Sequence, residues 1–340
     1  MSFRKLLAAL LALGGAALTL AQSNITADVC ADPSAFTSCT AKAVTDSKQC
    51  IDVCNGNKIC VLACGCVMYQ VFINCVAESC WNQAYSCEYG KLVAAYFAQC
   101  PTASEPIPFW PAPDNAHAGC SCNLGKVLQS VIKAQKEYNS CITDSSSMSV
   151  IDLANKDTAC GCCEISAGLS AMYETCPDTV PADMGADQWL PASTLYGTTI
   201  KWDSCGSVLG QYDCAKLKFA APSTNSSTFY GPDNLPPNGT QTLYNTGAAN
   251  AMTAPPSGPV MTWSQTSITY IVTASPWKND HVKATGTGTG AGAAGTAGAT
   301  GTAAGASETG AAMASRQSSY VVWLPFVVLI GKVLWDSWGV

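Results

Sequence analysis

The sixteen residues from Cys60 to Cys75, CVLACGCVMYQVFINC, contain four cysteines and an apolar run between the last two. The run from Cys66 onward is apolar enough for a buried helix. The cysteines could be metal ligands, a redox motif, halves of disulfide bonds or the frame of a ligand pocket. The compartment in which the chain folds helps to decide, because disulfides persist in exported proteins and are rare in the cytosol.

The amino terminus has the pattern of a secretory signal peptide. Arg4 and Lys5 precede an apolar run from Leu6 to Leu20, and small residues suit cleavage after Ala21. This run is too short to span a bilayer comfortably. We therefore expect residues 1–21 to be removed and the mature chain to fold in an oxidising compartment.

The carboxyl end is apolar as well, since residues 320–340 begin with the run YVVWLPFVVLI. Small residues at Ser307 and Gly310 are candidate attachment sites for a glycosylphosphatidylinositol (GPI) anchor, with a polar spacer before the apolar tail. The alternative is a single membrane helix, which would carry Lys332 and Asp336 inside it at a cost. Under either interpretation, we expect the protein to be tethered to the outer face of a membrane.

Composition divides the chain between these ends. Residues 22–219 contain all 20 cysteines and are predicted to form the ectodomain. Residues 220–283 are rich in Pro, Asn, Ser and Thr, and we expect an extended linker with one hairpin near Thr262–Thr273. Residues 284–319 are mostly Gly, Thr and Ala without an aromatic side chain, so they predict a disordered stalk and anchor spacer.

Charged residues make up only 12% of the chain, about half the usual share, so other groups must supply surface polarity. Three sequons, at Asn24, Asn225 and Asn238, predict N-linked glycans in an exported protein. A sequence pI near 4.9 and a net charge of −6 argue against nucleic acid as a partner.

Apolar periodicity predicts a mostly helical, all-α ectodomain. Residues 123–141 are predicted to form a helix with one apolar face, at spacings of three and four, made of Leu124, Val127, Leu128, Val131, Ile132 and Tyr138. Residues 66–80 and 162–176 are two further apolar helix candidates, the latter with Ile165, Leu169, Met172 and Tyr173 clustered. Three C-x-C pairs, each before such a stretch, suggest related units over about 50–100 and 120–176.

Disulfide bonds explain the cysteines better than zinc or redox chemistry. The one C-x-x-C motif, Cys160 to Cys163, lies in no βαβ pattern, and neither His117 nor His281 has ligand spacing to a cysteine cluster. Adjacent cysteines of a C-x-C pair rarely bond each other, so we expect each pair to join two different elements. The cysteines expected in disulfides, with connectivity left open, are Cys30, Cys39, Cys50, Cys54, Cys60, Cys64, Cys66, Cys75, Cys80, Cys87, Cys100, Cys120, Cys122, Cys141, Cys160, Cys162, Cys163, Cys176, Cys205 and Cys214.

The spacing Cys50-x3-Cys54-x5-Cys60-x3-Cys64-Gly-Cys66-x8-Cys75-x4-Cys80, with Cys100 further on, resembles the CFEM domain of fungal extracellular membrane proteins. The resemblance implies a basket of helices held by four disulfides and, in some members, haem bound through an aspartate just before the C-x-C pair. This chain has Val61, Leu62 and Ala63 there. The signal, stalk and tail resemble the layout of fungal GPI-anchored wall proteins.

We therefore predict a non-enzymatic, glycosylated protein of the fungal cell surface or wall, with a structural or interaction role. One alternative is a binding module for haem, the one cofactor considered, or another flat apolar ligand, with Tyr69, Phe72 and Trp81 lining a pocket. These apolar residues could instead form only the core. A second alternative is an adhesin that contacts wall polysaccharide through exposed Trp and Tyr residues after Phe219. No metal ligand is predicted, and no catalytic residue, because the common hydrolase and phosphate-binding motifs are missing from the sequence.

Overall fold

The computed structural model describes residues 25–143, 150–186, 200–222, 228–248, 252–265 and 268–279. The predicted signal peptide, stalk and apolar tail lie outside these residues, as do Asn24, Asn225, Ser307 and Gly310. All 20 cysteines and Asn238 lie within them.

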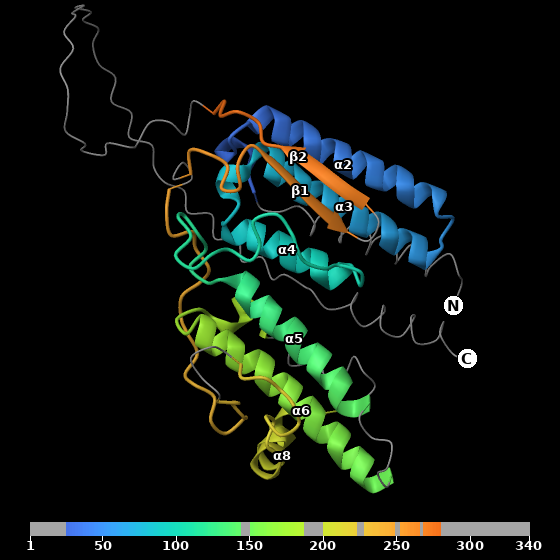
Figure 1. Cartoon of the computed structure of the whole chain (residues 1–340), viewed down its shortest axis with the longest axis vertical. Helices are drawn as coiled ribbons and strands as arrows, with labels where there is room; N and C mark the ends of the chain where they lie inside the picture. The colour runs from blue at the N-terminus through green and yellow to red at the C-terminus, as the bar shows by residue number, and fades with distance from the viewer. Residues whose placement is uncertain are drawn as a thin grey trace, which may run out of the picture.

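The described helices lie side by side in chain order, and each packs against the next, from α2 to α8 (Figure 1). This confirms the prediction of a mostly helical fold with many disulfides. The helices are α2 (Pro33–Val53), α3 (Lys58–Ser79), α4 (Cys87–Gln99), α5 (Leu124–Thr143), α6 (Val150–Thr175) and α8 (Cys205–Gln211), with 3₁₀ turns η1 (Ala27–Val29), η2 (Trp81–Gln83), η3 (Pro181–Met184) and η4 (Trp202–Ser204).

Side-chain caps fix where the first helices begin. Asp32 accepts a hydrogen bond from the Ala35 amide at the start of α2, and Ser86 accepts one from the Tyr89 amide at the start of α4. The Asn57 side chain accepts two at the start of α3. Just before it, Gly56 has φ 81°, a left-handed conformation that glycine adopts without steric cost. These signals turn α2 back onto α3 as an antiparallel pair.

The buried apolar side chains form two clusters. The first gathers α2, α3, α4 and the loop at Ile107–Trp110, and the second gathers α5, α6 and the residues around Cys214 and Phe219. The helix faces predicted from periodicity point into the second cluster, where Val127, Tyr138 and Leu169 are buried. The helix α3 is long and apolar enough to cross a membrane by length and composition, and half of its most apolar stretch is buried inside the fold.

Residues 228–279, which we call the C-terminal strap, return along the helices from α6 to α2 (Figure 1). The Ser166 hydroxyl donates a hydrogen bond to the Tyr230 carbonyl at 2.6 Å, and the Ser121 amide donates one to the Tyr244 carbonyl at 2.8 Å. Further on, β1 (Val260–Gln265) and β2 (Ile268–Thr273) form an antiparallel hairpin, and β2 packs on α3. The strap was expected to be a linker with one hairpin. The hairpin is present, but the described segment is packed against the helices along its course.

Ten disulfides join all 20 cysteines, and no cysteine is free. The pairs are Cys30–Cys80, Cys39–Cys75, Cys50–Cys64, Cys54–Cys60, Cys66–Cys100, Cys87–Cys120, Cys122–Cys176, Cys141–Cys160, Cys162–Cys205 and Cys163–Cys214.

Each C-x-C pair connects to two different elements, as predicted. Cys120 bonds to α4 of the first cluster, whereas Cys122 bonds to the end of α6 in the second. The expected position of the pairs was partly wrong, because those at Cys64 and Cys160 lie within α3 and α6 rather than ahead of them. A C-x-C pair inside a helix points its two side chains in different directions, which serves the same purpose.

Candidate functional site

The three residues predicted to line a ligand pocket lie together in the first core cluster. Tyr69, Phe72 and Trp81 are 6%, 4% and 1% exposed. Burial raises the pKa of the Tyr69 hydroxyl from 10.0 to about 12. All three side chains therefore belong to one buried core, as packing rather than as the wall of an open cleft.

The strap covers Trp81 directly. The Trp81 and Trp277 rings meet edge to face with centroids 5.7 Å apart, and the Trp81 indole N–H donates to the Ser275 carbonyl at 2.9 Å. The Ser275 amide in turn donates to the Glu78 carbonyl of α3 at 2.7 Å. An aromatic pair with a satisfied indole N–H is a favourable way to bury two tryptophans.

The hairpin covers the face of α3 beside it. Trp263 and Tyr270 are opposite each other in the hairpin register, and their rings stack with centroids 5.1 Å apart. The Trp263 indole N–H donates to Asn74 Oδ1 at 2.7 Å, and the Tyr270 hydroxyl donates to Gln70 Oε1 at 2.6 Å. Two polar side chains of α3 thus hold the two strands in one register.

A buried polar network continues from this contact into α4. The Gln70 amide donates to the Tyr96 hydroxyl at 3.0 Å, and that hydroxyl donates to Gln265 Oε1 at 3.1 Å. The Gln265 amide group donates to the Ser104 carbonyl, and the Ser104 amide donates back to Gln265 Oε1 at 3.2 Å. Because buried polar groups are costly when unpaired, such a satisfied network favours one docked position of the hairpin.

The end of the strap is hydrogen-bonded to the start of the described chain. The Lys278 amide donates to the Ala31 carbonyl at 2.8 Å, and the buried Asn279 side chain donates to the Cys30 carbonyl at 2.9 Å. The Lys278 ammonium lies 2.8 Å from the buried Asp32 carboxylate. Its hydrogen bond lowers the pKa of Asp32 against the opposing effect of burial. The last described residues therefore lie beside the first.

The aromatic residues after Phe219 are less exposed than the adhesin hypothesis required. Trp263 is buried, and Tyr230, Tyr270 and Trp277 are partly buried against the helices. Among the Trp and Tyr residues that the structure describes after Phe219, Tyr244 is the one with more than half of its surface exposed, at 52%. A row of exposed aromatic side chains for sugar stacking is not seen in this part of the chain.

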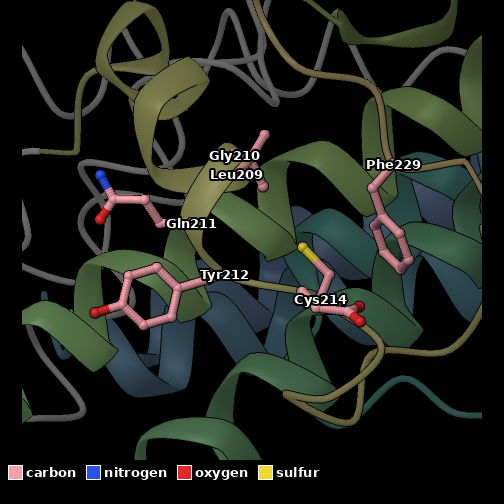
Figure 2. A pocket seen from close by; sticks show the side chains of 7 residues that line it. Leu209, Gly210, Gln211, Tyr212, Cys214 and Phe229 are labelled. Carbon is pink, nitrogen blue, oxygen red and sulfur yellow. The ribbon is translucent and has the colours of Figure 1, made fainter.

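Two shallow surface hollows lie away from Tyr69, Phe72 and Trp81. The larger, of about 340 Å³, is at the end of α8, where Cys214 lies between Tyr212 on one side and Phe229 on the other (Figure 2). Asp213 also lines this hollow, and its carboxylate accepts a hydrogen bond from the Ala215 amide at 3.0 Å. The smaller, of about 280 Å³, lies between residues 25–29 and the strap.

Glu164 is a buried carboxyl group in the middle of α6, with 6% of its surface exposed. Burial raises its pKa from 4.5 to about 8, so it is largely protonated at neutral pH. A raised carboxyl pKa occurs in catalytic acids, but it also occurs wherever a carboxyl group is simply buried. Glu164 lines neither of these two hollows, and its raised pKa makes the stability of the fold depend on pH.

Asn238 is the sequon residue that the structure describes, and it is exposed. Its Oδ1 accepts a hydrogen bond from the Tyr173 hydroxyl, which leaves the amide nitrogen, the atom that carries an N-linked glycan, free of that contact. The next residue, Gly239, packs so closely on Asp178 that an added Cβ would lie 2.2 Å from the Asp178 carbonyl carbon. The sequon is therefore displayed on an anchored, surface-facing segment.

Comparisons of the chain with protein-family models, with curated proteins and with solved structures found no match. The resemblance of Cys50–Cys100 to the CFEM pattern therefore stays a prediction, and the geometry above is what supports a function.

Proposed function

We propose that this chain is a non-enzymatic, glycosylated protein of the fungal cell surface or wall, with a structural or interaction role. Its ectodomain would be held at its carboxyl end by a GPI anchor or a membrane helix. The observation that carries the proposal is the complete pairing of 20 cysteines in ten disulfides. Such a density of disulfides is expected of exported chains and not of cytosolic ones.

The hydrogen bonds from the Asn279 side chain to the Asp28 and Cys30 carbonyls, which we call the clasp, support a tether at one end of the ectodomain. The predicted stalk begins five residues further on, so it would leave the ectodomain beside Asp28 and Cys30. The turn after α2 lies at the other end of that 21-residue helix, roughly 30 Å away at 1.5 Å per residue. A pull on the stalk would act on the clasp, next to the Cys30–Cys80 disulfide.

The exposed Asn238 supports a glycosylated surface. Little of this chain is charged, and N-linked sugar would supply polarity and bulk where the backbone is anchored. Replacing Thr240 by alanine removes the sequon without changing Asn238 or its contact with Tyr173. In the secreted protein this change should lower the mass by one glycan and leave the fold intact.

The test is the location and anchor of the full-length protein in fungal cells. Antibody labelling of intact cells should detect the ectodomain, and phosphatidylinositol-specific phospholipase should release it if the anchor is GPI. Retention after phospholipase, with release by detergent, would indicate the membrane helix instead. Labelling only after permeabilisation would refute the proposed location.

A chain ending at Ser319 is the matched control, since it lacks the apolar tail but keeps the ectodomain and stalk. It should appear in the culture medium with its disulfides intact. If this shortened chain stayed on the cell surface as well as the full chain does, the tail would not be the tether.

A further inference from the structure

Two neighbouring disulfides close the turn between α2 and α3. Cys50 is in the last turn of α2 and Cys54 caps its end, while Cys60 and Cys64 are one turn apart on α3, so the antiparallel helices bring the pairs face to face. The sulfurs of Cys54 and Cys64, which belong to different disulfides, lie 3.6 Å apart. Four sulfurs thus form one contiguous cluster.

The two sulfurs in contact belong to the more buried residues of the cluster. Cys54 and Cys64 are 5% and 2% exposed, whereas Cys50 and Cys60 are partly exposed. Each disulfide therefore joins one partly exposed outer cysteine to one buried inner cysteine. A thiol from solvent would reach an outer sulfur, and the thiolate that this attack releases would be an inner one.

We propose that this cluster is a thiol–disulfide exchange site that converts two disulfides into one when a thiol reductant attacks it. A thiolate of the reductant attacks Cys50 Sγ, the bond to Cys64 breaks, and Cys64 leaves as a thiolate. The Cys64 thiolate attacks Cys54 Sγ, the bond to Cys60 breaks, and Cys60 leaves as a thiolate. A second thiol of the reductant then displaces Cys50 from the mixed disulfide, and the two outer thiolates take protons from water.

The balance of this sequence is a two-electron reduction. One dithiol is oxidised to a disulfide, the protein keeps a new Cys54–Cys64 bond, and thiols appear at Cys50 and Cys60. Attack at Cys60 Sγ first gives the same products by the mirrored route. The inner sulfurs need to close from 3.6 Å to a bond length of about 2.0 Å, and two side chains share that movement.

Two further features favour this site over the other disulfides. Cys54 and Cys60 are only six residues apart, the shortest separation of the ten pairs. Their bond therefore restrains the unfolded chain least, and opening it costs the fold the least stability. Cys60 is in the first turn of α3, and its amide donates to the Asn57 cap at 3.2 Å. A helix N-terminus stabilises a thiolate, which makes Cys60 the better leaving group.

The test uses the secreted protein with all disulfides intact and one equivalent of dithiothreitol. The reaction is stopped with acid and N-ethylmaleimide before unfolding. The sequence allows the four cysteines to be separated for mass spectrometry, because cleavage before Asp52, after Lys58 and after Leu62 places each on its own peptide.

The expected result is N-ethylmaleimide on Cys50 and Cys60. The Cys54 peptide should be cross-linked to the peptide that contains Cys64 and Cys66, and this second peptide should still be bonded to the Cys100 peptide. Label on Cys54 together with Cys60, or on Cys50 together with Cys64, would mean simple opening of one disulfide and would overturn the proposal. If N-ethylmaleimide labelled the cysteines of any other disulfide before those of this cluster, the proposal would be overturned as well.

A double variant, Cys50→Ser with Cys64→Ser, is the matched control, since Cys39–Cys75 and Cys54–Cys60 still join α2 to α3. In this variant no exchange partner is present, so label should appear on Cys54 and Cys60 together. The wild-type result remains decisive if the variant folds poorly.

Discussion

The buried carboxyl group of Glu164 predicts an unusual dependence of stability on pH. Its pKa is about 8 in the folded protein and 4.5 as the ordinary value. Between these pH values the folded state binds more protons than the unfolded state, so the free energy of unfolding falls as pH rises. At about 1.4 kcal/mol per pH unit, the loss over this range is on the order of 5 kcal/mol as an upper bound.

The perturbation is Glu164→Gln, which keeps the shape of the side chain and removes the ionisation. Near pH 4.5 the variant and the wild type should have similar stability, whereas near pH 8 the variant should be more stable by several kcal/mol. Guanidinium chloride unfolding of the disulfide-intact protein, followed by tryptophan fluorescence, measures the difference. Glu78→Gln on α3, where the carboxylate is exposed, is the control and should change little. Equal pH dependence in the Glu164 variant and the wild type would refute the reasoning.

Three further predictions concern the strap. Asp32→Asn should lower the free energy of unfolding by about 1 kcal/mol at neutral pH, and the difference from wild type should disappear as pH falls through the lowered pKa of Asp32, measured by chemical unfolding. Tyr270→Phe should cost about 1–2 kcal/mol because Gln70 Oε1 loses its donor, whereas Tyr212→Phe, outside the network, should cost less in the same assay. Haemin titrated into the cysteine-rich fold with its strap should show the absorbance of free haemin, because Tyr69, Phe72 and Trp81 are buried and Trp277 of the strap packs on Trp81; a saturable Soret shift near one equivalent would contradict this burial.

Local patterns were enough to predict the main helices and the role of the cysteines. The apolar spacing in α5 and α6 identified the buried faces, and the strain of bonding neighbours indicated that Cys120 and Cys122 would connect to different elements. The partners themselves could not be read, because they depend on which helices pack together. The capping signals at Asp32 and Ser86 could have located the starts of α2 and α4.

The packing of the strap could not be predicted in the same way. Its contacts join residues far apart in sequence, such as Trp81 with Ser275 and Asp28 with Asn279, and they use single side-chain hydrogen bonds rather than a periodic apolar face. Whether the candidate pocket is open could not be predicted either, for a related reason. Tyr69 and Phe72 have the residue types of both a pocket and a core, and only the packing of the folded chain around them decides between the two.

The disulfide map of the protein secreted by eukaryotic cells tests the account most directly. Digestion without reduction, followed by mass spectrometry, should find no free thiol and the ten pairs seen here. The decisive bonds are Cys87–Cys120 and Cys122–Cys176, which divide one C-x-C pair between the two helical clusters. Free thiols at these positions, or both members of the pair bonded within one cluster, would contradict the arrangement on which the proposed function depends.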